Sequence, residues 1–264
     1  MHGSDTRDSP DTNEPHRLST VGKMNTRSNI MVFGGSGVIG GAIATVFGHQ
    51  GWRVGLHYHQ HQTAANETAA AIRKAGGESH LYQADIANSS QIQAILQEFI
   101  QSHHSLNVLV WAVGVDPSKL LLKTSPEDWT RTLHTNLTGA YTVLKAIAPI
   151  FEQQNDGAVI FIGSLSAEQG VAGQAAYAAS KAGLTGLMQT VAKEWGAFNI
   201  RVNMVFPGWH LSPLSEPGWQ SAMEPRNHTL HRPSSLQYMA TTVYHMALSP
   251  HTSGQIWNLD SRIW

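Results

Sequence analysis

The 264-residue chain contains no cysteine. Disulfide bonds, thiolate nucleophiles and thiolate metal sites are therefore excluded, and this absence fits the reducing cytoplasm, where we expect the protein to reside. Charged residues are also scarce, at 13% of the chain, and the formal net charge is −1. Because neither sign is in excess, the composition indicates no partnership with nucleic acid or with an anionic membrane surface.

Long apolar runs are absent as well. None approaches the ~18–20 residues that a membrane-spanning helix needs, and the first residues lack the apolar core of a signal peptide. We interpret residues 1–27 as a flexible polar tail and expect no membrane association. Hydrophobic residues still make up 41% of the chain, which suits a single domain over residues 28–264 with a substantial core.

Short apolar segments alternate along the chain with stretches of helical periodicity. This alternation predicts right-handed βαβ units, and hence an α/β, Rossmann-type doubly wound parallel sheet of about seven strands. A ligand is then expected at the carboxyl ends of the strands. Residues 209–232 break the rhythm, and we interpret them as a mobile lid. The predicted strands are 29–33, 53–57, 79–83, 107–112, 157–162, 200–206 and 255–259, and the predicted helices are 38–50, 64–75, 89–103, 126–154 and 174–198.

A glycine-rich segment, FGGSGVIG, follows the first predicted strand and opens the first helix. It contains Gly34, Gly37 and Gly40 at a spacing of three. A pyrophosphate bound at a helix N-terminus needs a tight turn and a close approach of the backbone, and glycine permits both. The position of the segment therefore predicts a dinucleotide site. The alternative is a tight strand-to-helix turn that binds nothing.

The end of the second predicted strand bears on the choice of dinucleotide. A carboxylate there would hold the ribose 2′-hydroxyl of NAD and repel the 2′-phosphate of NADP. The segment LHYHQ contains no carboxylate. His59 or His57 can instead donate a hydrogen bond to a 2′-phosphate, so we expect NADP(H) rather than NAD(H). The alternative is that these are exposed loop histidines without a ligand.

The segment YAASK places Tyr177 and Lys181 four residues apart on a predicted helix. Such residues lie about 6 Å apart on one face, and a nearby ammonium is expected to lower the pKa of a phenol from ~10. The tyrosine can then give a proton to a carbonyl oxygen or take one from an alcohol. Ser164, at the end of the fifth strand, can hydrogen-bond the same oxygen. The alternative is an ordinary exposed helix face.

With these motifs in this order, the chain from Asn29 onward resembles the short-chain dehydrogenase/reductases, most closely their 3-oxoacyl-carrier-protein reductase-like members. The resemblance also rests on ADI at 84–86, NLTG at 136–139, Pro207 with Gly208, and SGQIWNLD at 253–260. It implies a catalytic set of Ser164, Tyr177, Lys181 and Asn136, and no metal. The cofactor contacts that it implies are Gly34, Ser36, Gly37, Ile39, Gly40, His59, Asp85, Ile86, Gly114, Tyr177, Lys181, Pro207, Gly208 and Ser212.

Three positions depart from the family pattern. Phe33 stands in place of a threonine, Val38 in place of the second glycine, and Trp111 in place of the first asparagine of Asn-Asn-Ala-Gly. These departures are expected to affect the affinity for the cofactor more than they affect the fold. The resemblance further implies that Asn136 holds a water that relays protons to Lys181. It also implies that Lys181 holds the nicotinamide ribose.

The resemblance implies NADPH-dependent reduction of a ketone to a secondary alcohol, with a 3-oxoacyl thioester linked to acyl carrier protein as the substrate. One alternative is an NAD-linked alcohol or sugar dehydrogenase of the same fold, and another is a non-catalytic dinucleotide-binding protein. A carrier protein favours a basic patch at the entrance, but Arg131, Lys145 and Arg201 are scattered in the sequence. Family members are mostly tetramers, so we expect a homotetramer or a dimer.

Three features beyond the sixth strand each leave two interpretations open. His210 faces the substrate or belongs to the lid. The C-terminal residues 256–264 pack on a neighbouring subunit or within their own chain. Three large side chains either line an apolar substrate pocket or pack inside the lid: Trp209, Trp219 and Met223.

Overall fold

The computed structural model describes residues 27–212, 215 and 224–262. Within these ranges, seven strands form one parallel sheet in the order β3-β2-β1-β4-β5-β6-β7. This confirms the predicted fold class. The strands are β1 (Asn29–Phe33), β2 (Arg53–Tyr58), β3 (Glu78–Gln83), β4 (Val108–Trp111), β5 (Gly157–Ile162), β6 (Ile200–Phe206) and β7 (Ile256–Asn258).

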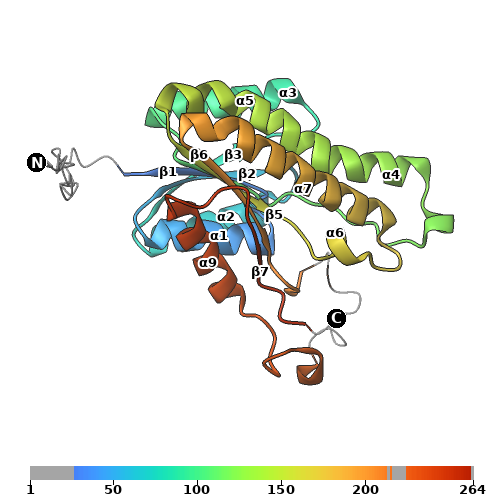
Figure 1. Ribbon diagram of the computed structural model, residues 1–264. Coiled ribbons are helices and arrows are strands. Elements are labelled where there is room, and N and C mark those ends of the chain that lie inside the picture. The colour runs from blue at the N-terminus through green and yellow to red at the C-terminus, as the bar shows by residue number, and fades with distance from the viewer. Residues whose placement is uncertain (1–26, 213–214, 216–223, 263–264) are drawn as a thin grey trace, which may run out of the picture.

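Helices cover both faces of the sheet (Figure 1). One apolar cluster joins the sheet to α3, α5 and α7, and a second joins the opposite face to α1, α2 and α9. No helix in the described ranges is long and apolar enough to cross a membrane. The helices are α1 (Val38–His49), α2 (Gln62–Lys74), α3 (Ser89–His103), α4 (Pro126–Leu133), α5 (Gly139–Gln154), α6 (Ser166–Gln169), α7 (Ala175–Trp195) and α9 (Leu236–Leu248).

The central strands are apolar on both sides because helices cover both of their faces. Every residue of β1, β4 and β5 is buried, whereas the edge strand β3 buries only Ser79 and Tyr82. The chain runs from β1 outward to β3 and then returns to β4, which lies on the other side of β1. The connections leaving β1 and β4 therefore diverge, and this divergence opens a crevice at the carboxyl edge of the sheet.

Two features of the helices are not predicted by the sequence pattern. Helix α9 lies within a stretch for which no element was expected, since its β-branched and aromatic residues have low helix propensity. It forms because Ser235 caps its first turn and its buried face packs on α1. The predicted helix over 126–154 is present, but a π-helical turn (His134–Thr138) and α5 follow α4 within it.

Candidate active site

The glycine turn between β1 and α1 brings the backbone close to the end of β4. Gly34 has a φ of +83°, and an added Cβ would lie 2.8 Å from the backbone of Ala112. A Cβ on Gly40 would lie 2.3 Å from the Gly34 carbonyl oxygen. No side chain among the described residues caps the first turn of α1, so its amide groups remain available to an anion. The turn therefore fits the pyrophosphate of a dinucleotide.

The departures from the family pattern leave this turn in place. Phe33 and Trp111 are fully buried, and their rings pack 5.9 Å apart in the core. Within the described part of the chain, the indole nitrogen of Trp111 has no hydrogen-bond partner. Val38 is the first residue of α1 and is partly exposed. The two aromatic substitutions thus replace polar groups under the turn with apolar packing.

His57 connects the turn to the neighbouring strand end. Its Nδ1 accepts a hydrogen bond from the Gly34 amide at 3.3 Å, and its Nε2 donates to the Ala84 carbonyl oxygen at 3.0 Å. The ring is buried and stacks on Phe33 at 4.9 Å. Burial lowers the pKa of His57 to about 4, so the neutral ring is present at neutral pH. Both nitrogens are occupied, so of the two histidines considered from the sequence only His59 remains available to a ligand.

Because the buried ring of His57 is neutral, this residue is expected to make the stability of the protein sensitive to acid. Between pH 6.5 and 4 the unfolded chain binds a proton at this position that the folded chain does not, so the free energy of unfolding falls as the pH falls. The shift from 6.5 to about 4 corresponds to a loss of roughly 3 kcal/mol. We expect urea unfolding at a series of pH values to show a smaller loss over this window in His57→Asn. Equal losses in the two proteins would contradict this assignment.

A cavity of about 940 Å³ extends from the glycine turn across the ends of β2 and β3. It holds seven of the predicted cofactor contacts, and His59 lies in it with Nε2 4.0 Å from the Asp85 carboxylate. The opposite wall comes from α4 and the turn that follows it, which the sequence reasoning did not assign to the site. The predicted contacts in this cavity are Gly34, Ser36, Gly37, His59, Asp85, Ile86 and Gly114.

A second cavity of about 150 Å³ continues from the first, since both are lined by residues 112–114. It contains three of the four predicted catalytic groups, those of Ser164, Tyr177 and Lys181, and the structure thereby brings the carboxyl end of β5 against the start of α7. Gly40 lines neither cavity and instead packs beneath the glycine turn. The predicted residues in the second cavity are Ile39, Gly114, Ser164, Tyr177, Lys181, Pro207, Gly208 and Ser212.

Tyr177 and Ser164 both line this cavity, and their side chains interact. Burial raises the pKa of Tyr177 to about 12, the bond to Ser164 opposes this shift, and the charge of Asp116 adds to it. The expectation that Lys181 lowers the tyrosine pKa is therefore wrong for the protein alone. The ammonium lies 5.6 Å from the centre of the ring and donates to the Ile162 carbonyl oxygen at 2.9 Å, and burial outweighs any effect that it has on the pKa of Tyr177.

Lys181 is buried, and this burial lowers its pKa to about 8. Asn136 lies in the π-helical turn and is fully buried. Its amide exchanges hydrogen bonds of 2.8 and 3.0 Å with the backbone of Val115 and donates to Ser180 at 2.9 Å. Asn136 therefore fixes the loop after β4 to the helix that carries Tyr177 and Lys181.

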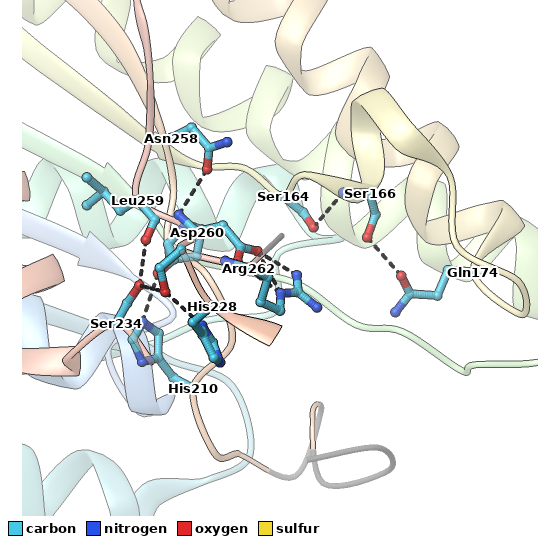
Figure 2. Close-up of polar contacts among 12 residues, drawn as sticks. Ser164, Ser166, Gln174, His210, His228, Ser234, Asn258, Leu259, Asp260 and Arg262 are labelled. Atoms are coloured by element: carbon cyan, nitrogen blue, oxygen red, sulfur yellow. Dashed lines mark hydrogen bonds and ion pairs between the residues drawn. The ribbon is translucent and has the colours of Figure 1, made fainter. Parts of the chain in front are cut away.

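A chain of polar side chains that the sequence reasoning missed lies beside Ser164. Ser166 donates its backbone N–H to the Ser164 hydroxyl at 3.2 Å and its own hydroxyl to Gln174 Oε1 at 2.9 Å (Figure 2). Gln174 Nε2 in turn donates to Asp116 Oδ2 at 2.6 Å. The sequence held only a weak sign of this chain of contacts, namely that Asp116 lies two residues after the predicted cofactor contact Gly114. The pairing with Gln174 could not be predicted, because the two residues are 58 positions apart.

The C-terminal segment supplies the opposite side of the cavity. Arg262 and Asp260 form a bidentate ion pair (Figure 2). The Arg262 guanidinium lies 4.9 Å from the ring of Trp209. Residues 256–262 thus pack within their own chain. His210 is buried and lines the cavity, and its Nε2 donates to the Pro207 carbonyl oxygen at 2.9 Å. Trp219 and Met223, assigned to a pocket or lid, lie outside the described residues.

Comparison with known proteins gives a consistent result. The family described as short chain dehydrogenase matches residues 28–221. A 3-oxoacyl-[acyl-carrier-protein] reductase from Synechocystis sp. is 33% identical over 235 residues, which is 87% of this chain and 94% of that protein. A human protein of the same name is 31% identical over 229 residues, which again is 87% of this chain and 94% of that protein. The crystal structure of a dehydrogenase/reductase from Sinorhizobium meliloti 1021 superposes with a TM-score of 0.81 at 26% identity, covering 89% of this chain and 94% of that chain.

Proposed function

Because this chain belongs to the short-chain dehydrogenase family of NAD(P)-dependent oxidoreductases, we propose that it reduces a ketone to a secondary alcohol with NADPH. The observation that carries the proposal is the meeting of Ser164, Tyr177 and Lys181 in a cavity that continues into the cavity at the glycine turn. When bound there, the nicotinamide supplies the hydride.

The protonation of Tyr177 supports the direction of reduction. With its pKa raised to about 12, the phenol keeps its proton at neutral pH. It is therefore ready to act as the general acid that protonates a carbonyl oxygen, whereas alcohol oxidation would need the phenolate. The Ser164 hydroxyl, oriented by the Ser166 amide, can hydrogen-bond the same oxygen and hold it in place.

NADPH is favoured over NADH by the residues at the end of β2. No carboxylate follows Tyr58 there, and His59, Gln60 and His61 line the cavity. We expect fluorescence titration to show tighter binding of NADPH than of NADH. His59→Ala should weaken NADPH binding by up to roughly tenfold, the effect of losing one hydrogen bond to a charged group, and leave NADH binding unchanged.

The matched control for this titration is His49→Ala, an exposed position at the end of α1 that lines neither cavity. It should bind both dinucleotides as the wild type does. Tighter binding of NADH by the wild type, or equal effects of His59→Ala on the two cofactors, would count against the assignment.

Lys181 predicts an alkaline limit to cofactor binding. Its pKa is about 8 in the protein alone, so the ammonium that can bind ribose hydroxyls is present below pH 8 and lost above it. We expect the Kd of NADPH to rise above pH 8, by at most roughly tenfold per pH unit for a single proton. In Lys181→Met the affinity should be weaker and lack this limit. The same rise above pH 8 in both proteins would contradict the role of Lys181.

The names of the relatives support a 3-oxoacyl thioester, carried by acyl carrier protein, as the ketone. The three basic residues considered for carrier binding do not gather at the entrance of the cavities. Arg131 lines the larger cavity and pairs with Asp128, whereas Arg201, in β6, pairs with Asp156 just before β5. A short 3-oxoacyl thioester without the carrier protein is therefore the first substrate of this class to test.

A further inference from the structure

The loop after β4 places a carboxylate in the cavity that contains Tyr177. Asp116 lines this cavity together with Ser164 and Gln174, and its charge is close enough to raise the pKa of Tyr177. The relatives' reaction acts on a ketone flanked by an acyl chain and a thioester. Neither group can donate a hydrogen bond to a carboxylate, so Asp116 indicates a second kind of substrate.

The hydrogen bonds of Asp116 leave it with accepting capacity. A carboxylate has about four lone-pair sites. Oδ2 accepts from the Ser118 hydroxyl at 3.1 Å and from Gln174 Nε2 at 2.6 Å, and Oδ1 accepts from the Ser118 amide at 2.9 Å. These three donors hold the carboxylate in position, and Oδ1 can accept one further hydrogen bond.

Gln174 presents the complementary group. Its Oε1 accepts from Ser166 and one N–H of its Nε2 is given to Asp116, which leaves the second N–H of Nε2 as a donor. The amide is thereby held at both ends, between a carboxylate and a hydroxyl. The wall beside Ser164 and Tyr177 thus offers one acceptor and one donor on neighbouring side chains.

A hydroxyl group matches this pair, because it donates one hydrogen bond and accepts another. An ammonium can satisfy the carboxylate alone, and an anionic group is repelled by it. We propose that the enzyme also reduces ketones that carry a hydroxyl beside the carbonyl, with Asp116 as the residue that selects them. This inference rests on the proposed ketone reduction and extends it to a substrate class that the relatives' names do not give.

The test compares hydroxyacetone with butan-2-one, two ketones of nearly equal size that differ by a hydroxyl in place of a methyl group. The kcat/KM of each is measured with saturating NADPH in the wild type and in Asp116→Asn. We expect the wild type to favour hydroxyacetone by roughly tenfold or more, the effect of one hydrogen bond to a charged group. In Asp116→Asn this ratio should fall towards one.

The control variant is Asp156→Asn, which changes a half-exposed carboxylate at the opposite edge of the sheet and should keep the wild-type ratio. Melting temperature and NADPH affinity verify that Asp116→Asn folds. A ratio near one in the wild type, or an unchanged ratio in a folded Asp116→Asn, would overturn the inference. Reduction of a 3-oxoacyl thioester but of neither small ketone would overturn it and leave the proposed function standing. No reduction of any ketone would overturn both.

Discussion

Replacing Tyr177 with phenylalanine should abolish most ketone reduction and leave NADPH binding nearly unchanged. The substitution removes only the hydroxyl that pairs with Ser164, so the carbonyl oxygen loses its proton donor. General acid catalysis contributes typically 10²–10⁴-fold, and we expect kcat to fall by roughly that factor. The ring itself remains, and with it the packing against Lys181. Steady-state kinetics and a fluorescence titration with NADPH measure the two effects separately.

The matched control is Tyr141→Phe. Tyr141 is a half-exposed residue of α5, and its hydroxyl contacts only Lys145 within the described structure. This variant should keep the wild-type kcat. A fully active Tyr177→Phe enzyme would show that the cavity identified here is not the site of proton transfer.

Gly40→Ala should abolish cofactor binding. The added Cβ would lie 2.3 Å from the Gly34 carbonyl oxygen and 2.9 Å from its carbon, both of which are backbone atoms. The turn must therefore move, and Gly34 already packs on the backbone of β4's end with a positive φ. Alanine normally stabilises a helix relative to glycine by roughly 0.5–1 kcal/mol, so a loss of stability at Gly40 would reflect the clash alone.

Gly186→Ala is the control for this substitution. Gly186 lies in α7 on an exposed position, and a Cβ there meets nothing within 4 Å. We expect it to raise the free energy of unfolding by up to about 1 kcal/mol and to leave NADPH affinity intact. Normal NADPH binding by Gly40→Ala would mean that the turn does not bind the pyrophosphate.

Local patterns predicted the elements that carry the site. The apolar runs before Gly34 and Ser164 are strands because both faces of the sheet are covered. The spacing of Tyr177 and Lys181 predicted a shared helix face, and both residues do line one cavity. These features depend on residues close in sequence, so the chain alone was sufficient to predict them.

Contacts between segments that are distant in the sequence could not be predicted from local patterns. The link from Asp116 to Gln174 spans 58 residues, and the ion pair of Asp260 and Arg262 reaches the cavity only because β7 is the last strand of the sheet. The pKa of Tyr177 was predicted in the wrong direction for a related reason. Spacing placed an ammonium nearby, but the pKa shift is set mainly by the burial of the phenol, which spacing does not reveal.

The most direct test of the central claim is transfer of a labelled hydride. NADPH that carries deuterium on the reactive nicotinamide carbon is incubated with the wild type and a short 3-oxoacyl thioester, and separately with hydroxyacetone. Mass spectrometry of the alcohol product then locates the label. We expect deuterium on the carbinol carbon of at least one product, and roughly 10²–10⁴-fold slower transfer by Tyr177→Phe. Tight NADPH binding without transfer of deuterium to either ketone would contradict ketone reduction.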